Sequence, residues 1–417
     1  MKNVKLSDKN IKNAPEGTFC SGCAACVVVC PKNAISLKLN KVGFYEAFLN
    51  EDLCIRCGKC QMVCNRYQNV QGVSLYDAVH YAMQSQNSDV VRNCSSGGLA
   101  YELAAQAMEN NEVVVGCIYN CEKQRAEHII VEHRVDLELL KGSKYVQSNA
   151  ADAFYKAVEK ASEDKEKKLT VFGTPCQIAG FARTAEVLGF RDRTLLVEIF
   201  CHGVPSYHVW DMQLEKISKK LGGNPENVQF RYKKDDWHSY CIKAEKDKNI
   251  WYGTREKSEF WHVFFENVLL NDACMVCKER GEVSMADIRL GDYWGHRFEK
   301  HSDGVSAVFA LTEKGKKVIH ELEKNEMLTV LENGTVEEML RAQNMSGYDR
   351  DKKHKDAMEA LEAGKNVKDA ISIYRKQFTA KQKIKRVLLK VSSLLPADLR
   401  AGLRKKNSSR YTKQSKG

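Results

Sequence analysis

Cys20-Ser-Gly-Cys23-Ala-Ala-Cys26-Val-Val-Val-Cys30-Pro31 and Cys54-Ile-Arg-Cys57-Gly-Lys-Cys60-Gln-Met-Val-Cys64-Asn65 are two cysteine ladders with one spacing, C-x2-C-x2-C-x3-C. This spacing is typical of bacterial ferredoxins that hold two 4Fe-4S clusters. Three thiolates of a ladder wrap one cluster, and the fourth reaches the other cluster. The ladders therefore predict one cluster on Cys20, Cys23, Cys26 and Cys64, and a second cluster on Cys54, Cys57, Cys60 and Cys30.

Two zinc sites are the alternative interpretation of the same cysteines. Zinc favours separated C-x2-C knuckles around a tetrahedral ion, whereas two four-fold ladders suit cubane clusters better. Pro31 follows the first ladder as in ferredoxins, but Asn65 stands in that place after the second. Between the ladders, residues 34–50 alternate apolar and polar positions around Gly43, which predicts a short hairpin.

Length and cysteine content set the broad class. A chain of 417 residues exceeds one hydrophobic core, so we expect an α+β ferredoxin-like dicluster domain (1–72), an α/β body (73–345) and a helical extension (346–417). The first fifteen residues lack an apolar export signal, so sixteen cysteines indicate metal ligands in a reducing cytoplasm rather than disulfides. No apolar run reaches the eighteen residues that span a bilayer.

The net charge of +11 is concentrated at the C-terminus. Residues 371–417 contain fourteen Lys and Arg and one acidic residue, so the other 370 residues carry a net charge of −2. Nucleic-acid recognition needs a basic surface on the folded domain. This distribution therefore argues against a nucleic-acid partner.

Apolar runs followed by Gly- or Pro-bearing loops and helical periodicity predict the α/β body. In residues 169–181 and 194–206, a buried-strand pattern leads into a loop with Cys176 or Cys201. Ligands bind at such carboxyl ends of parallel strands. Together with Cys274 and Cys277, these residues would supply four thiolates for a third cluster. The alternative is that they are ordinary core cysteines.

Two further loops have the composition of cofactor cradles. Residues 95–98 (SSGG) precede a helical pattern, and residues 142–148 (GSKYVQS) offer hydroxyls, a cation and an aromatic ring. Hydroxyl-bearing, Gly-rich turns at helix N-termini suit phosphate or flavin contacts. A helix N-cap is the alternative interpretation of the first loop.

Taken together, these loops resemble the family of coenzyme F-420 hydrogenase/dehydrogenase beta subunits, here with an N-terminal two-cluster ferredoxin domain. The resemblance rests on SSGG (95–98), GSKYVQS (142–148), GTPCQIAG (173–180), CHGVPS (201–206), C-x2-C (274–277) and ADIRLGDYWG (286–295). It covers most of residues 1–300, and the six elements in this order are more specific than any one of them.

The resemblance implies an iron–sulfur flavoprotein with a flavin-binding body that holds FAD or FMN beside a third 4Fe-4S cluster. The cluster would be held by Cys176, Cys201, Cys274 and Cys277. The flavin would be bordered by Ser95, Ser96, Gly97 and Gly98, and contacted by Gly142, Ser143, Lys144 and Tyr145, with Thr174 and Pro175 nearby. His202 and Asp292 are candidate proton handlers.

The expected function is electron transfer between the clusters and a small hydride-accepting or hydride-donating molecule, with a ferredoxin-like or other redox partner protein. Flavins reconcile one-electron and two-electron chemistry. Two alternatives remain open: a non-catalytic relay subunit that passes electrons to a separate enzyme, and a membrane-associated accessory protein with structural clusters. Fold-level likeness does not choose the substrate.

The C-terminal stretch predicts charged, solvated helices and then a basic amphipathic tail. Its apolar stripe is flanked by lysines and arginines and consists of Ile384, Val387, Leu388, Val391, Leu394 and Leu395. Such a helix suits peripheral contact with the inner face of an anionic membrane. Docking on the body or on a partner is the alternative.

Overall fold

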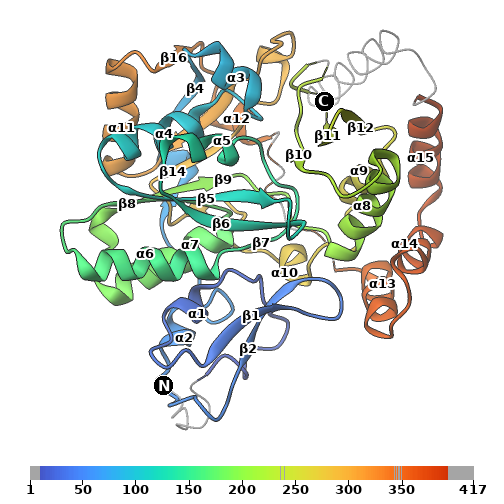
Figure 1. Ribbon diagram of the computed structural model, residues 1–417, viewed down its shortest axis with the longest axis horizontal. Helices are drawn as coiled ribbons and strands as arrows, with labels where there is room; N and C mark the ends of the chain where they lie inside the picture. Colours follow the sequence, from blue (N-terminus) through green and yellow to red (C-terminus); the bar gives the residue numbers. More distant parts are fainter. Residues whose placement is uncertain are drawn as a thin grey trace.

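The structure is a computed structural model that describes residues 10–392, except positions 235, 239, 342, 344, 346, 347 and 349. Its first part contains two short helices, α1 (Ala25–Val28) and α2 (Lys59–Val63), each formed within one cysteine ladder. Between them β1 (Ile35–Leu39) pairs antiparallel with β2 (Tyr45–Leu49), which confirms the predicted hairpin. This dicluster domain lies beneath the larger body in Figure 1.

A nine-stranded mixed sheet forms the centre of the body, with the order β16-β4-β15-β14-β9-β8-β5-β6-β7. The four strands β14, β9, β8 and β5 are mutually parallel. Their near-continuous apolar runs, such as Leu195–Val197, are buried because both faces of the sheet are covered. The strands are β4 (Val79–Ser85), β5 (Val113–Asn120), β6 (Arg125–Val131), β7 (Ser148–Asn149), β8 (Leu169–Gly173), β9 (Thr194–Ile199), β14 (Ile288–Asp292), β15 (Ser306–Ala310) and β16 (Leu328–Leu331).

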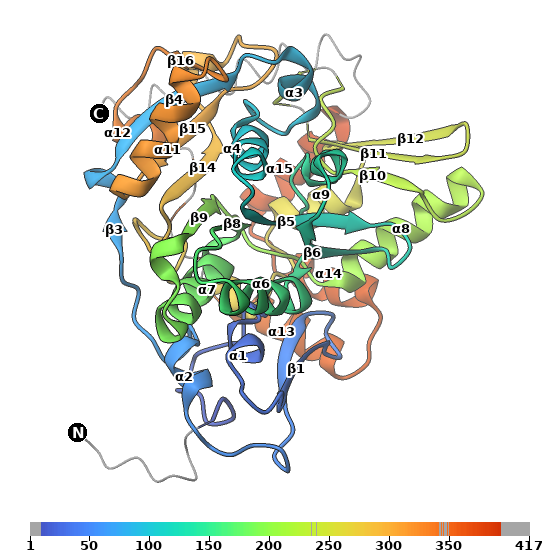
Figure 2. The same ribbon diagram turned by 60° about the vertical axis from the view of Figure 1, so that its left-hand side comes forward.

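Helices cover the two faces of the sheet. On one face, α6 (Ala151–Glu163) and α7 (Pro175–Leu188) lie between the sheet and the dicluster domain, and α1 packs against both, as Figure 2 also shows. On the other face, α4 (Leu99–Glu109) and α11 (Glu313–Lys324) pack on a separate apolar core. This α/β arrangement confirms the predicted class of the body. It places the amino end of α7 next to the cysteine ladders.

A third layer lies beside the sheet in Figure 1. It consists of α8 (Tyr207–Leu221), α9 (Glu259–Phe265) and a three-stranded antiparallel sheet, β10 (Asn227–Gln229), β11 (Cys241–Lys246) and β12 (Asn249–Thr254). Trp210, Phe260 and Trp261 are fully buried at its centre. The remaining short elements are β3 (Val73–Ser74), α3 (Ser88–Asn93), α5 (Leu137–Leu140), α10 (Asp272–Met275), β13 (Val283–Ser284) and α12 (Val336–Arg341).

The C-terminal helices α13 (Lys352–Glu362) and α14 (Val367–Lys376) differ from the solvated extension that the sequence predicts. Each buries one face, including Leu361 and Tyr374, in the core built on α8 and α9. Arg375 also forms ion pairs with Glu259 and Glu266 of that layer. The many charged residues of α13 and α14 make these segments look solvated in the sequence. Their apolar residues form one face only when they are placed at the 3.6-residue period of a helix.

The last helix, α15 (Ala380–Ser392), presents two different faces. Arg386 reaches Glu259 and Glu266, which holds the helix beside α9. The predicted apolar stripe is exposed at Ile384, Val387, Leu388 and Val391, while Leu394 and Leu395 lie outside the described residues. Among the helices that the structure describes, none is long and apolar enough to cross a membrane.

Replacing Leu361 by Ala should destabilise the body, because this side chain is 5% exposed within the core of α8, α9, α13 and α14. Removing a buried leucine of this kind costs about 2–5 kcal/mol. Thermal unfolding followed by circular dichroism should show a lower Tm. Glu359→Ala on the exposed face of α13 is the matched control and should leave Tm nearly unchanged. Equal Tm values for both variants would mean that the extension is not part of this core.

Candidate iron–sulfur centres and the path between them

The cysteine ladders surround two separate cavities. The first encloses about 340 Å³ of space, part of it open to solvent, and its cysteines are Cys20, Cys23, Cys26 and Cys64. The second encloses about 330 Å³, and its cysteines are Cys30, Cys54, Cys57 and Cys60. We name these sets the inner site and the outer site. Each site takes three cysteines from one ladder and one from the other, which is the exchange that the ladder spacing predicts.

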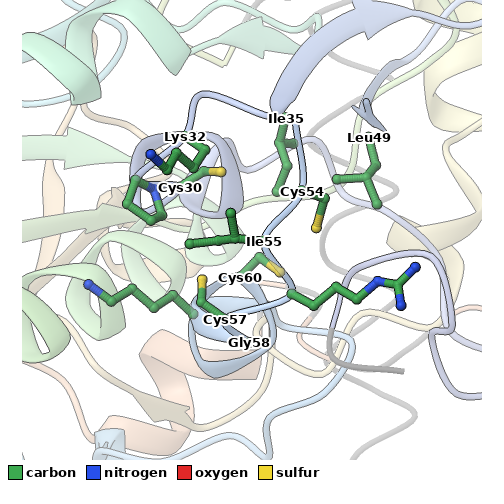
Figure 3. Close-up of a pocket in the computed structure, with 12 residues that line it drawn as sticks. Cys30, Lys32, Ile35, Leu49, Cys54, Ile55, Cys57, Gly58 and Cys60 are labelled. Atoms are coloured by element: carbon green, nitrogen blue, oxygen red, sulfur yellow. The ribbon is translucent and has the colours of Figure 1, made fainter. Parts of the chain in front are cut away.

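The sulfur atoms of the outer site lie around one space in Figure 3, with Ile55 beside them. Cys57 is exposed, whereas Cys60 is buried. The inner and outer sites are neighbours, since Cys26 and Cys60 belong to one small apolar cluster with Ile11 and Ile35. One ligand of each site therefore belongs to the same packed cluster.

Burial makes both sites unfavourable for free thiolates. Burial raises the pKa of Cys23 to about 12, with Cys64 adding to the rise. The pKa of Cys60 is raised to about 11 by burial and then by Cys57. Several thiolates in one low-dielectric space repel each other unless a cation compensates them. The iron of a 4Fe-4S cluster supplies that compensation, so the donor set fits the group.

The inner site adjoins helix α7 of the body. A Cβ added at Gly180 of α7 would lie 2.9 Å from the Cβ of Ala25 and 3.1 Å from Sγ of Cys23. Only a glycine permits this approach without a shift of α1, because the Ala25 methyl group and the Cys23 sulfur leave no room for a side chain. Gln147 adds a second contact, since its side chain donates to the Ser21 and Tyr45 carbonyls and accepts from Tyr45 N–H.

Asn65, which replaces the proline of the ferredoxin pattern, joins the two domains. Its side-chain amide donates to the Cys176 carbonyl at 2.9 Å. Its oxygen accepts from Arg183 Nη1 at 2.6 Å, and Arg183 also pairs with Glu279 at 3.6 Å. Proline has no side-chain donor or acceptor for these bonds. The departure from the ferredoxin pattern therefore serves the contact with the body.

The structure brings the four body cysteines, Cys176, Cys201, Cys274 and Cys277, into one electrostatic neighbourhood, which we name the body site. Burial raises the pKa of Cys274 to about 12, with Cys201 and Cys277 adding to the rise. Burial also raises the pKa of Cys176 well above its usual value, followed by Cys277 and by Cys23 of the inner site. The body site and the inner site are therefore neighbours.

Local structure explains how the body site is assembled. Cys176 lies in the first turn of α7 and not, as the sequence suggests, in the loop before it, because Thr174 and Gln177 form a capping box around Pro175. Cys201 follows β9, and Cys274 lies in α10. The two segments are joined by Asn271 N–H, which donates to the Val204 carbonyl. A Cβ added at Gly203 would lie 3.2 Å from that of Cys274.

A buried arginine accompanies the body site. Arg280 is 3% exposed and donates to the Cys274 carbonyl. Its charge opposes the rise of the Cys201 and Cys277 pKa values that burial causes. Arg66 holds a similar place at the inner site, which it lines. Neither arginine belongs to a spacing pattern, so the sequence alone gives no signal for them.

The loops predicted to hold a flavin meet each other. Ser143 N–H donates to Ser95 Oγ at 2.8 Å, and Gln177 Nε2 donates to Ser148 Oγ, which connects residues 142–148 with the start of α7. Gly97 and Gly98 precede α4 and are tightly packed against protein atoms. Ser96 Oγ donates to the Val305 carbonyl. These contacts with other protein atoms are enough to explain why the residues of the SSGG loop are small.

Lys144 and Tyr145 are engaged by the protein. Lys144 Nζ donates to the carbonyls of Leu139, Leu140 and Lys141 at the end of α5, and burial lowers its pKa to about 8. Tyr145 accepts a hydrogen bond from Arg231 Nη1 through its hydroxyl. Gly142 and Pro175 form no side-chain hydrogen bond, because they lack the groups. In this arrangement the ammonium of Lys144 caps a helix.

Arg231, a residue absent from the sequence-based site, is the centre of a cluster that connects both loops. Arg231 donates to Tyr145 Oη, Asp292 Oδ2 and the Trp237 carbonyl, and lies 4.3 Å from the Tyr240 ring centre. Trp237 stacks on Trp294 with ring centres 4.9 Å apart. Lys233 links the cluster to the SSGG loop by donating to the Ser96 carbonyl. We name this set the Arg231 cluster: Tyr145, Arg231, Trp237, Tyr240, Asp292 and Trp294.

Two polar atoms of this cluster, Trp237 Nε1 and Asp292 Oδ1, are buried without a hydrogen-bond partner among the described residues. His202, the other candidate proton handler, lies elsewhere, bonded to Asn267 and Tyr348. Burial lowers the His202 pKa to about 4, so it is neutral near pH 7. Of the two candidates, only Asp292 adjoins the predicted flavin loops.

Comparison with known proteins gives two family matches. Residues 19–66 match the 4Fe-4S dicluster domain, and residues 166–334 match the C terminus of the coenzyme F-420 hydrogenase/dehydrogenase beta subunit. The second match includes all four body cysteines and Arg231. The loops at 95–98 and 142–148 lie outside both matched ranges.

Relatives of known name are distant. The coenzyme F-420-dependent sulfite reductase of Methanocaldococcus jannaschii is 26% identical over 323 residues, covering 74% of this chain but only 46% of that protein. One of the subunits of the F(420)H(2) dehydrogenase of Methanosarcina mazei is 24% identical over 310 residues, covering 72% of this chain and 80% of that one. The chain thus spans less than half of the sulfite reductase.

One solved structure gives a weaker likeness. A chain of the F-420-reducing NiFe hydrogenase complex from Methanosarcina barkeri aligns with a TM-score of 0.46 and 16% identity, covering 73% of this chain and 91% of that one. The two four-cysteine cavities and the dicluster match define this protein as an iron–sulfur electron-transfer protein. Residues 166–334 match the C terminus of the coenzyme F-420 hydrogenase/dehydrogenase beta subunit, so this part of the body is similar to that family.

Because each site takes one cysteine from the other ladder, variants in different ladders should lose the same cluster. Cys23→Ser and Cys64→Ser should each lose the inner cluster, about four iron atoms per chain, although the two residues belong to different ladders. The double variant should lose no more than either single variant. Iron analysis of anaerobically purified protein measures this, with Cys121→Ser, a half-buried thiol outside the three sites, as control. Twice the iron loss in the double variant would contradict the exchange.

Restoring the ferredoxin pattern by Asn65→Pro should weaken the contact between the domains while leaving the iron content intact. Arg183 is 5% exposed and would lose one of its partners, which costs about 1–3 kcal/mol. A lower Tm of the iron-loaded protein is the expected result. Asn69→Ala is the matched control, because Asn69 contacts Arg183 through its backbone carbonyl. If both variants have the parental Tm, the Asn65 bonds do not hold the domains together.

Proposed function

We propose that this protein is an iron–sulfur oxidoreductase in which three 4Fe-4S clusters connect a redox partner protein to a flavin that exchanges hydride with a small molecule. The observation that carries the proposal is the contact of the inner site with α7. A Cβ added at Gly180 would lie 3.1 Å from Cys23 Sγ, and Cys176 lies in the first turn of the same helix. The outer, inner and body sites therefore follow one another without an intervening layer of protein.

The ligands that we propose are the twelve cysteines of these three sites. Each cluster passes one electron at a time. The domain contacts of Asn65 and Gln147 keep the first two clusters at a fixed place relative to the third. Arg66 and Arg280 each supply a positive charge beside a negatively charged cluster. This favours the reduced state, because a nearby cation stabilises added negative charge.

We propose the Arg231 cluster and the adjoining loops as the flavin site, with FAD or FMN as the flavin. Two orphaned polar atoms, Trp237 Nε1 and Asp292 Oδ1, and a buried cation fit the polar edge of a flavin ring. Bound there, the flavin would supply the conversion between one-electron and two-electron chemistry. The candidate border residues are Ser95, Ser96, Gly97, Gly98, Gly142, Ser143, Tyr145, Thr174 and Pro175. Lys144 would contribute indirectly, because its ammonium holds the end of α5 beside residues 142–148.

Within this site the chain's own residues have distinct tasks. Arg231, which is itself buried, holds Asp292 and Tyr145 in fixed orientations and compensates negative charge. Trp237 and Trp294 form an aromatic wall beside it. Asp292 Oδ1 is the buried acceptor available to take or return a proton when a hydride carrier changes its protonation.

The second candidate is an electron-relay subunit without turnover of its own. The Methanosarcina mazei relative is named as a subunit of a dehydrogenase, and it aligns over most of its length. In that case the redox partner protein would receive electrons and a separate enzyme would perform the hydride chemistry. Both candidates need the same cluster path, and they differ in whether small-molecule substrate is consumed by this chain alone.

We place the protein in the cytoplasm, with contact to an anionic membrane surface through α15 as a further part of the proposal. Sixteen free thiols suit a reducing compartment. The exposed apolar stripe and the basic residues of α15 suit the surface of a bilayer. For the domain bounds we retain 1–72, 73–345 and 346–417.

Anaerobic purification should yield about twelve iron atoms per chain, at four per cluster, together with a flavin absorption spectrum. Acid extraction followed by chromatography identifies FAD or FMN. Iron for three clusters without flavin, and without substrate turnover, would reject the oxidoreductase and favour the relay.

Cys176→Ser tests the cluster path within the same preparation. This variant should retain about eight iron atoms per chain, because only the body site is lost. Electrons placed on the inner and outer clusters by dithionite should then reach the flavin far more slowly than in the parent. Cys94→Ser, a buried thiol outside the three sites, is the matched control. Unchanged flavin reduction in Cys176→Ser would remove the body site from the path.

A further inference from the structure

The two cysteine ladders repeat one backbone path. Gly22 and Arg56 occupy equivalent positions and have left-handed φ values of 67° and 55°. Ala24 and Gly58 are also equivalent, with φ values of 69° and 79°. A left-handed residue at both positions is therefore required to wrap a cluster. Glycine adopts that conformation most readily, and a bulky side chain there is unfavourable.

What differs between the repeats is the surface that each loop faces. In the inner loop, a Cβ added at Gly22 would lie 2.4 Å from Gln147 Nε2 and 2.5 Å from the Tyr45 carbonyl. The Ser21 carbonyl accepts a hydrogen bond from Gln147, and Ala25 packs against Gly180. The inner loop consists of small residues because Gln147 and Gly180 of the body, and Tyr45 of β2, lie against it.

The outer loop carries Ile55, Arg56 and Lys59 at the positions of Ser21, Gly22 and Ala25. Every residue that lines the outer cavity comes from positions 30–60, so the body leaves this side free. Ile55 is 56% exposed, and Arg56 is exposed despite its left-handed backbone. An apolar side chain in water and an arginine in a glycine conformation are both locally unfavourable, and such strain gathers at functional sites.

The chemistry of this surface is specific. The charged side chains that line the outer cavity are all basic, namely Lys32, Arg56 and Lys59. Nearby, Leu53 is 50% exposed and Met62 is 53% exposed. Glu51 is paired with Lys12, which leaves Asp52 as the neighbouring acidic side chain without an ion pair among the described residues. An apolar centre with a charged rim is the usual composition of a protein interface.

We propose that this surface, formed by Lys32, Leu53, Ile55, Arg56 and Lys59, is the docking site for a small acidic one-electron carrier protein. The inference rests on the proposed function, because it supplies that function with its electron donor or acceptor. One electron leaves the reduced carrier and reduces the outer cluster by one electron, and no bond or proton is transferred. Exposed Cys57 lies within the surface, so docking shortens the path to the cluster.

The test measures reduction of the iron-loaded protein by stopped-flow absorbance with two donors. One donor is a reduced 2Fe-2S ferredoxin with an acidic surface, and the other is dithionite. Arg56→Glu should lower the second-order rate with the ferredoxin roughly tenfold and weaken its salt dependence, because charge at an interface rim acts mainly on association. The rate with dithionite, a small anion that needs no docking surface, should fall far less than the rate with ferredoxin, and the iron content should stay at the parental value.

Two further variants separate docking from structure. Arg56→Gly removes the charge and relieves the left-handed backbone, so it should raise Tm yet still slow the reaction with ferredoxin. Lys324→Glu on α11, at the opposite end of the molecule from the dicluster domain, is the matched charge reversal and should leave both rates unchanged. A loss of rate in Lys324→Glu equal to that in Arg56→Glu would attribute the effect to net charge and overturn the proposal.

Failure of the docking site is distinguishable from failure of the proposed function. If Arg56→Glu and the parent react equally fast with ferredoxin at low salt, the docking site is wrong, while flavin reduction by dithionite still supports the oxidoreductase. If the parent binds anionic vesicles and Arg56→Glu abolishes that binding, the surface belongs to a membrane contact. If the parent is a dimer and Arg56→Glu dissociates it, the surface belongs to a second copy. Either result would also overturn the proposal.

Discussion

The contact between α1 and the amino end of α7 is the constraint on which the rest of the structure depends. It requires a glycine at position 180, small residues in the inner cysteine loop, and an asparagine where ferredoxins have proline. Gly180 is a poor choice for an independent helix and Asn65 departs from the ferredoxin pattern, but both suit the contact between the two domains. The dicluster domain is therefore a fixed extension of the body, since its inner site lies against the helix that carries Cys176 in its first turn.

The same contact also determines which charged residues lie near the cysteines. Twelve cysteines form three groups; burial raises the pKa of Cys23 and Cys176, and iron is the compensating charge that such a donor set fits. Around them the protein adds fixed cations unevenly, with Arg66 at the inner site, Arg280 at the body site, and Lys32 with Arg56 at the surface. Half-buried Arg66 and buried Arg280 thus lie beside cysteines, whereas Arg56 is exposed to solvent.

The sequence predicts features that form within one segment of the chain, but it does not predict sites that distant segments form together. The alternation of residues 34–50 predicts the hairpin, and the spacing of the two ladders predicts the grouping of Cys64 with the first ladder. The body site joins segments that begin near residues 176, 201 and 274, so its grouping is suggested only when several motifs are combined. Arg231 and the packing of α13 escape prediction from sequence, because a buried cation and a charged amphipathic helix have no distinctive spacing. Whether a flavin occupies the Arg231 cluster stays a prediction.

The most direct measurement of the central claim is low-temperature EPR of the fully reduced, iron-loaded protein. Reduced 4Fe-4S clusters are paramagnetic, and neighbouring spins broaden and split each other's signals. If the outer, inner and body sites form one chain of adjacent clusters, the spectrum should show magnetic interaction among three clusters, integrating to about three spins per protein. A spectrum of two interacting clusters and a third that is magnetically isolated, or no third cluster at all, would contradict the continuous path.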